Sequence, residues 1–182
     1  AEFASSNFKS FEIKTVDNLY STVIAGNGDF TSCSFSGKTT LLSVDYLRVT
    51  DKVIDIAYMF YNCSSLTNLD VSGFDTTNVT RMDYMFQDCK SLTELDVSGF
   101  DTAKVTNMEH MFQGCSKLTS LDLSGFDTTK VARMNGMFHN CSSLTNLDLS
   151  GFDTAKVTLM NGMFYNCSSL TSLDVSGFDT AK

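Results

Sequence analysis

The sequence contains no proline and no tryptophan, and no apolar run reaches the roughly 18 residues that a membrane helix needs. Turns must therefore be built from Gly, Asp, Asn and Ser, and we expect no direct insertion into a membrane. Clusters of Lys and Arg are also missing, and the net charge is −8. Phosphate binding needs clustered positive charge, so this balance argues against nucleic acid as a partner.

What the sequence does contain is a repeat of 26 residues. The unit reads V-T-x-M-x-x-M-F-x-x-C-S-S-L-T-x-L-D-[VL]-S-G-F-D-T-x-K, with small departures. Five units follow one another, at residues 53–78, 79–104, 105–130, 131–156 and 157–182. A short unit of this kind cannot bury enough apolar surface alone, so the units have to stack on one another.

Stacking would place equivalent positions of the units in columns that run along the molecule. All nine methionines fall into two such columns, and ten of the 15 phenylalanines fall into two more. One column of each kind consists of Met59, Met85, Met111, Met137 and Met163, and of Phe60, Phe86, Phe112, Phe138 and Phe164. We expect these columns to form the core.

Each unit combines two kinds of hydrophobic spacing. Leu92, Leu95, Val97 and Phe100 fit L-x-x-L-x-L-x-x-F, the strand half of a leucine-rich repeat. Alternation along this strand predicts that Leu95 and Val97 point inward and that the intervening residues face solvent.

The following segment has a spacing that is typical of a helix. Val105, Met108, Met111, Phe112 and Cys115 lie 3, 3, 1 and 3 residues apart. The sequence therefore predicts an α/β leucine-rich-repeat solenoid, with a parallel β-sheet on one face and short helices on the other.

The residues outside the repeats predict caps and ends. Residues 1–52 do not repeat, are rich in β-prone residues and are expected to form an N-terminal cap over the open end of the solenoid. Leu41, Val44 and Val49 fit the strand pattern loosely, which indicates a degenerate half-unit before the first full one. The last unit ends without a recognisable cap, so we expect end-to-end self-association through an exposed terminal coil.

The repeat motif, clearest at 131–154, resembles the short repeat of BspA-like leucine-rich-repeat surface proteins. The resemblance covers 53–182 and does not extend to 1–52. It implies an extracellular domain on a bacterial cell surface, often an adhesin, whose anchor lies outside this sequence. The family has no catalytic residues to transfer, so the resemblance implies that the protein is not an enzyme and needs no cofactor.

The cysteines offer the first candidate chemistry. Five of the six form a column, and stacked side chains point the same way, which favours buried free thiols over disulfides. A disulfide between Cys33 and Cys63 is the alternative. Zinc is disfavoured because no C-x-x-C pair exists. The two histidines, His110 and His139, occupy different columns, and no plausible catalytic triad surrounds them.

Two aspartate columns follow the repeat as well. The column that includes Asp75 comes after the second Phe and is expected to cap the helices. The mid-strand column is expected to be solvated or hydrogen-bonded to the Thr67 and Ser72 columns. Ca²⁺ bound between coils is a weaker alternative. The mid-strand column consists of Asp70, Asp96, Asp122, Asp148 and Asp174.

Binding is expected on the open face of the sheet, because solenoids bind through extended concave surfaces. That face carries the aspartate column above and a variable column, which consists of Asn68, Glu94, Ser120, Asn146 and Ser172. The acidic, hydroxyl-rich face favours a polar or basic partner, such as a host or matrix protein or a glycan. The alternative is a stiff spacer without a ligand. Ice binding by the Thr67 column is disfavoured by the neighbouring charges.

Overall fold

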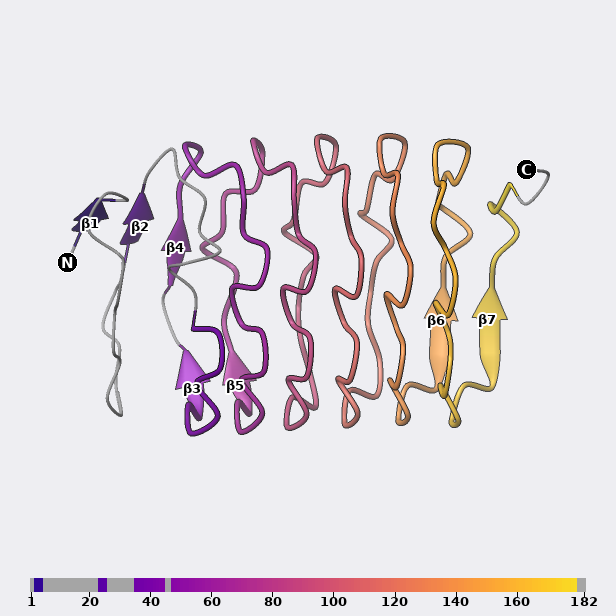
Figure 1. The fold of residues 1–182 in the computed structure, drawn as a ribbon, viewed down its shortest axis with the longest axis horizontal. Coiled ribbons are helices and arrows are strands. Elements are labelled where there is room, and N and C mark those ends of the chain that lie inside the picture. The colour runs from indigo at the N-terminus through magenta and orange to yellow at the C-terminus, as the bar shows by residue number, and fades with distance from the viewer. Residues whose placement is uncertain (1, 5–22, 26–34, 45–46, 180–182) are drawn as a thin grey trace.

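The structure is a computed structural model in which residues 2–4, 23–25, 35–44 and 47–179 are described. Coils of chain lie side by side along the long axis, and the two termini lie at opposite ends (Figure 1). Isolated parallel bridges join equivalent residues of successive repeats: Asp55 to Arg81, Arg81 to Asn107, Asn107 to Arg133 and Arg133 to Leu159. The five units therefore stack in register as predicted, and we call them coils 1 to 5.

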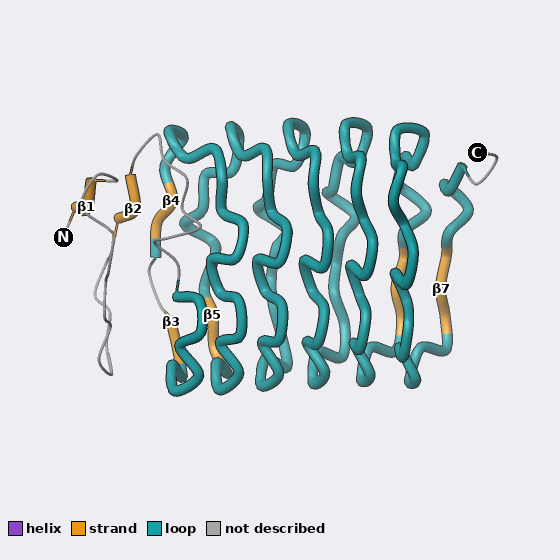
Figure 2. Tube along the Cα trace, in the orientation of Figure 1, coloured by secondary structure: helices purple, strands orange, loops and turns teal. Residues whose placement is uncertain are grey.

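Short parallel sheets replace the single continuous sheet that the sequence predicted. Strands β1 (Glu2–Ala4), β2 (Val23–Ala25) and β4 (Arg48–Val49) form a three-stranded sheet in the order β1-β2-β4. Strand β3 (Ser43–Val44) pairs with β5 (Asn68–Leu69), and β6 (Asn146–Asp148) pairs with β7 (Ser172–Asp174). The equivalent segments of coils 2 and 3 run extended without strand pairing (Figure 2).

Where the sheet is interrupted, there is more room around the glycine that follows each strand segment. An ideal Cβ on Gly73 would lie 2.7 Å from the carbonyl oxygen of Leu47 in the preceding coil. An ideal Cβ on Gly99, at the equivalent position one coil later, would meet no atom within 4 Å. The strands are therefore parallel and in register, as predicted, but the prediction of one continuous sheet is wrong because strand pairing is interrupted at coils 2 and 3.

The predicted helices are wrong: none occurs among the described residues. The segment 56–62 and its equivalents 82–88, 108–114 and 134–140 instead form tight turns that bond to the next coil, and we call this structure the turn ladder. In coil 1, the amides of Ile56, Tyr58, Phe60 and Asn62 donate to carbonyl oxygens of coil 2 at 2.7–3.2 Å. The amides of Met59 and Tyr61 donate three residues back within the same coil, to Ile56 and Tyr58, and the amide of Ala57 donates to the carboxylate of Asp55.

Backbone conformation explains why these turns do not continue as a helix. Two residues in each turn have a positive φ, as in Tyr58 (60°) and Asn62 (55°) of coil 1. The second of these positions holds Asn, Asp or Gly in every coil, the residues that adopt the left-handed region most readily. The spacing of three residues thus reflects successive turns, each of which returns an apolar side chain to the core.

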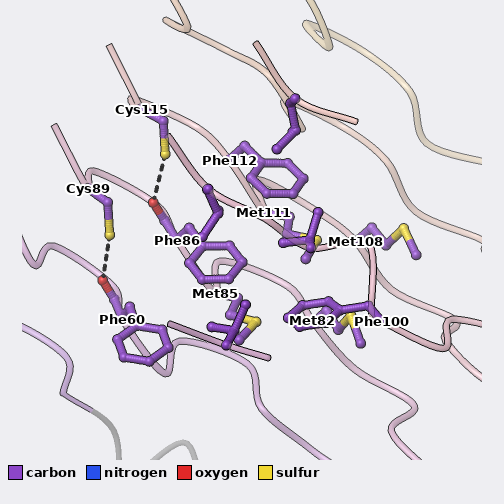
Figure 3. Packing of buried hydrophobic residues seen from close by; sticks show 14 of the residues in the cluster. Phe60, Met82, Met85, Phe86, Cys89, Phe100, Met108, Met111, Phe112 and Cys115 are labelled. Carbon is purple, nitrogen blue, oxygen red and sulfur yellow. Dashed lines mark hydrogen bonds between the residues drawn. The ribbon is translucent and has the colours of Figure 1, made fainter. Parts of the chain in front are cut away.

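The core is continuous through all the coils, as the columns predicted. Successive rings of the Phe60 column stack with centroids 5.6–5.8 Å apart and interplanar angles of 11° or less. Figure 3 shows these rings beside the methionine columns of coils 2 and 3. Met82, Met85 and Met111 are fully buried. This confirms that the methionine and phenylalanine columns of coils 1 to 4 lie in the core.

Much of the predicted cap at 1–52 lies outside the described residues, and so does Cys33. Within the described part, β2 pairs with β4 in parallel, and β3 pairs with β5 with Ser43 opposite Asn68. Leu41, Val44 and Val49 are buried in the same core as the repeats, which is consistent with a half-unit. The division into a cap and five repeats stays a prediction.

Candidate binding surface

The ten residues predicted to bind lie on one face, which we call the sheet face. Nine are exposed and Asp70 is half-buried, and they alternate with buried residues such as Leu69, Leu95 and Leu121. Strands β5, β6 and β7 carry Asn68, Asn146, Asp148, Ser172 and Asp174. Asp70 directly follows β5, and the extended segments of coils 2 and 3 carry Glu94, Asp96, Ser120 and Asp122.

The aspartates of the sheet face bond to their own coils. Each carboxylate accepts the backbone N–H of the serine two residues later at 2.9 Å, as Asp96 does from Ser98. Hydrogen bonds from Ser98 lower the pKa of Asp96, and those from Ser124 lower the pKa of Asp122. The predicted bonding to the Ser72 column is thus confirmed, whereas the Thr67 hydroxyl donates to the carbonyl oxygen of Leu42 instead.

A hollow of about 190 Å³ opens on this face. Asp70, Ser72, Asp96 and Ser98 line its polar side, and Leu69 and Phe100 contribute apolar lining. Among the described residues, no group of three or more His, Cys, Asp or Glu side chains is placed to hold a metal ion. The sheet face is therefore a row of anionic carboxylates and hydroxyls with a hollow between coils 1 and 2.

The second aspartate column does not cap helices, because no helix follows it. Asp75 accepts the N–H of Thr77 at 3.1 Å, and Asp127 accepts that of Thr129 at 2.9 Å, so each closes a turn. Hydrogen bonds from these threonines lower the pKa of both carboxyls.

A buried threonine column, which the sequence analysis did not single out, joins the coils at these turns. The Thr128 hydroxyl donates to the carbonyl oxygen of Asp153 in the next coil and accepts the N–H of the same residue. Its equivalents Thr76, Thr102 and Thr154 are also buried. A threonine present at this position in every unit was the available signal.

The cysteine column consists of free thiols, as predicted for the five described cysteines. Each thiol donates to the carbonyl oxygen of a phenylalanine in the preceding coil, as from Cys89 to Phe60 at 3.1 Å (Figure 3). Burial raises the pKa of Cys63 and of Cys141 to about 12. These thiols are neutral at physiological pH and act as small core residues.

A polar and aromatic cluster lies on the turn ladder of coils 1 to 4. Arg81 pairs with Asp83 at 2.7 Å and with Asp55 of the preceding coil at 3.1 Å. Further along, the Tyr84 hydroxyl and the Asn135 amide both donate to Glu109, at 2.9 Å and 2.8 Å. Burial and the hydrogen bond to Glu109 raise the pKa of Tyr84.

The architecture and the sheet face define a repeat protein with an extended surface and a continuous core. No helix among the described residues is long and apolar enough to cross a membrane. Residues 32–121 and 116–182 match the family described as "Mycoplasma protein of unknown function, DUF285". Because these matches cover most of the chain, the protein belongs to the DUF285 family.

Comparison with curated proteins gives no match. Among solved structures, the chain is similar to a leucine-rich cell surface protein from Faecalibacterium prausnitzii A2-165. The two are 23% identical with a TM-score of 0.43, and the similarity covers 73% of this chain and 38% of that chain. The chain thus spans well under half the length of that protein.

Proposed function

We propose that this chain is a non-enzymatic domain of a bacterial cell-surface protein, which binds a protein or glycan through its sheet face. The main support is the row of exposed side chains that runs over five coils and alternates with buried leucines and valines in coils 1 to 4. The repeat motif further supports membership of the 26-residue branch of BspA-like proteins, and thereby an extracellular location. The five described thiols lie in the core column as neutral groups, which fits a domain without a cysteine nucleophile.

Charge supports a polar or basic partner. Hydrogen bonds lower the pKa of Asp96, Asp122 and Asp148, so these carboxylates remain anionic at neutral pH. A partner that presents spaced basic or hydroxyl groups would meet the same chemistry at each coil. Repetition raises the apparent affinity of such a contact when several coils engage at once.

The test measures binding of the chain to a glycan array and to immobilised extracellular-matrix proteins. The variant Asp96→Lys/Asp122→Lys reverses charge on the sheet face. The matched control, Asp101→Lys/Asp127→Lys, makes the same charge change at exposed turns elsewhere, and both variants lose equivalent carboxylate–amide bonds. We expect the sheet-face variant to lose binding and the control to retain it; equal loss in both would reject a defined binding face.

A structural spacer is the second candidate. It is favoured by the single core that passes through all coils and by the turn ladder, which together make a stiff rod. If the chain is a spacer, both lysine variants should leave the activity of the parent protein unchanged. Deleting one complete coil, such as residues 131–156, would then change the reach of the protein and nothing else.

End-to-end self-association is a further proposal for this chain. Tyr165, Leu173 and Val175 of the last coil are exposed, and Met160 and Phe178 line an open apolar hollow of about 480 Å³ there. Analytical ultracentrifugation over a range of protein concentrations tests this proposal. A monomer at every concentration would reject it.

A further inference from the structure

Because the coils are nearly identical, their contacts must in some way specify which coil packs against which. Every coil offers its neighbours the same phenylalanine, methionine and cysteine columns, and the turn ladder uses backbone groups that any coil supplies. Neither the core nor the ladder therefore distinguishes coil 2 from coil 3 as the next element to dock. A displaced or exchanged coil would bury the same side chains, so the correct order needs contacts that differ from one junction to the next.

The outer side chains of the turn ladder provide such contacts. The position occupied by Tyr58 in coil 1 is occupied in coils 2 to 5 by Tyr84, His110, Gly136 and Gly162. Tyr58 stacks on Tyr84 with ring centroids 4.6 Å apart, and Tyr84 stacks on His110 at 5.1 Å with a tilt of 34°. The aromatic series thus ends at the junction between coils 3 and 4.

That junction has a glycine beside the His110 ring, and a larger residue there would meet the ring as it lies. A Cβ on Gly136 would collide with Nδ1 and Cε1 of the His110 ring. Gly136 also has a φ of 59°, which glycine adopts without strain. A coil that carries tyrosine at this position therefore fits after coil 3 only if the His110 ring moves from its place, although the core columns of that coil would fit unchanged.

Side-chain hydrogen bonds between residues next to this aromatic series also differ from one junction to the next. Arg81 joins coil 2 to coil 1 through Asp55, and the Tyr84 hydroxyl joins coil 2 to coil 3 through Glu109. Asn135 of coil 4 then donates to Glu109 of coil 3. Each of these three junctions has a donor and acceptor pair of its own, and these groups lose their partners if the coils are reordered.

We propose that the outer face of the turn ladder encodes the order of the coils: the series Tyr58, Tyr84, His110, Gly136, with its hydrogen-bond pairs, rejects wrong neighbours that the repeated core would accept. This is a use of polar and steric contacts to specify register, in which mismatched partners are penalised. It is independent of whether the sheet face binds a ligand.

Exchanging whole coils tests the proposal without changing composition or core. In the first variant, residues 79–104 and 105–130 trade places, so that Tyr84 follows His110. In the control variant, residues 131–156 and 157–182 trade places, so that Gly162 follows His110 and Asn161 replaces Asn135. We expect the first exchange to abolish the single cooperative urea transition or shift it to markedly lower urea, and the control exchange to leave it unchanged.

One substitution distinguishes contacts that specify the order of the coils from contacts that only add stability. Tyr84→Gly should destabilise the chain in its native order, because it removes two ring contacts and the bond to Glu109. In the exchanged chain the same substitution should raise the urea midpoint or restore folding, because it relieves the collision with His110. The proposal is overturned if Tyr84→Gly has the same sign in both chains, or if both exchanges unfold alike.

Discussion

The sheet face and the turn ladder are built from the same units but are held together differently. Between coils 2 and 3 the turn ladder contributes four backbone hydrogen bonds, from Met82, Tyr84, Phe86 and Asp88. On the sheet side, strand pairing is confined to the pairs β3–β5 and β6–β7 in the repeat region. The ladder therefore joins coils 2 and 3 through regular backbone hydrogen bonds, whereas the sheet side of these coils has no strand pairing.

The two sides also differ in how far their exposed residues vary from coil to coil. The aspartates and serines of the sheet face recur unchanged, which suits a surface that presents one chemistry many times. The outer residues of the turn ladder differ from coil to coil and interact in pairs, which suits contacts that identify particular coils. The following substitutions compare the two sides, from the largest expected effect to the smallest.

Removing a ring from the stack behind the turn ladder should have the largest effect. Phe112→Ala deletes contacts with both Phe86 and Phe138 and leaves a cavity in a fully buried site. We expect a loss of about 3–5 kcal/mol in the free energy of unfolding. Leu121→Ala, on the sheet side, should cost closer to 2 kcal/mol. Urea unfolding monitored by circular dichroism measures both, and a larger loss for Leu121→Ala would contradict the comparison.

The next largest difference is expected when a glycine on each side is replaced by alanine. Gly136→Ala forces a Cβ against His110 at a positive φ, and we expect it to cost roughly 1–3 kcal/mol. Gly99→Ala on the sheet side meets no atom within 4 Å and should be close to neutral. Thermal unfolding of the two variants checks this, and equal melting temperatures would contradict the expected difference between the two glycines.

Threonine hydroxyls allow a matched pair at smaller cost. Thr128→Val leaves the N–H and the carbonyl of Asp153 without their partner at a buried site, which should cost about 1–3 kcal/mol. Thr145→Val removes a single bond to the carbonyl oxygen of Thr119 at an exposed site, and water can replace it. Its loss should fall below about 1 kcal/mol. Denaturant midpoints at constant pH give both values.

Acidification should slightly lower the free energy of unfolding, because the sheet-face aspartates lose their stabilising charge. The pKa values of Asp96, Asp122 and Asp148 are lowered in the folded chain, so these groups stabilise it above their unfolded pKa. That contribution is lost as the pH falls through the folded pKa values. Asp122→Asn should therefore show a shallower loss of stability with acid than the unmodified chain. Identical pH profiles would mean that the bond to the Ser124 amide contributes nothing measurable.

Several features were accessible from the residues alone, and others were not. The alternation around Leu95 placed Asp96 on the exposed face, and the Met59 and Phe60 columns identified the core, because both follow from side-chain direction. The helix was wrong because spacings of three residues arise from a helix and from successive turns alike. The signal for left-handed turns was the one position of the unit that holds only Asn, Asp or Gly, namely Asn62, Asp88, Gly114 and Asn140.

By itself, the sequence determined the length of the repeat, the register of the coils and the residues that fill the core, since apolar spacing within a unit and identity between units leave few alternatives. Only the tertiary structure decided how the backbone is paired. Amides that a lone segment would satisfy in a helix find carbonyl oxygens on the next coil instead, and those acceptors exist only after the neighbouring coil has docked. The same holds for His110 above Gly136, a contact between residues 26 positions apart that no local pattern reveals.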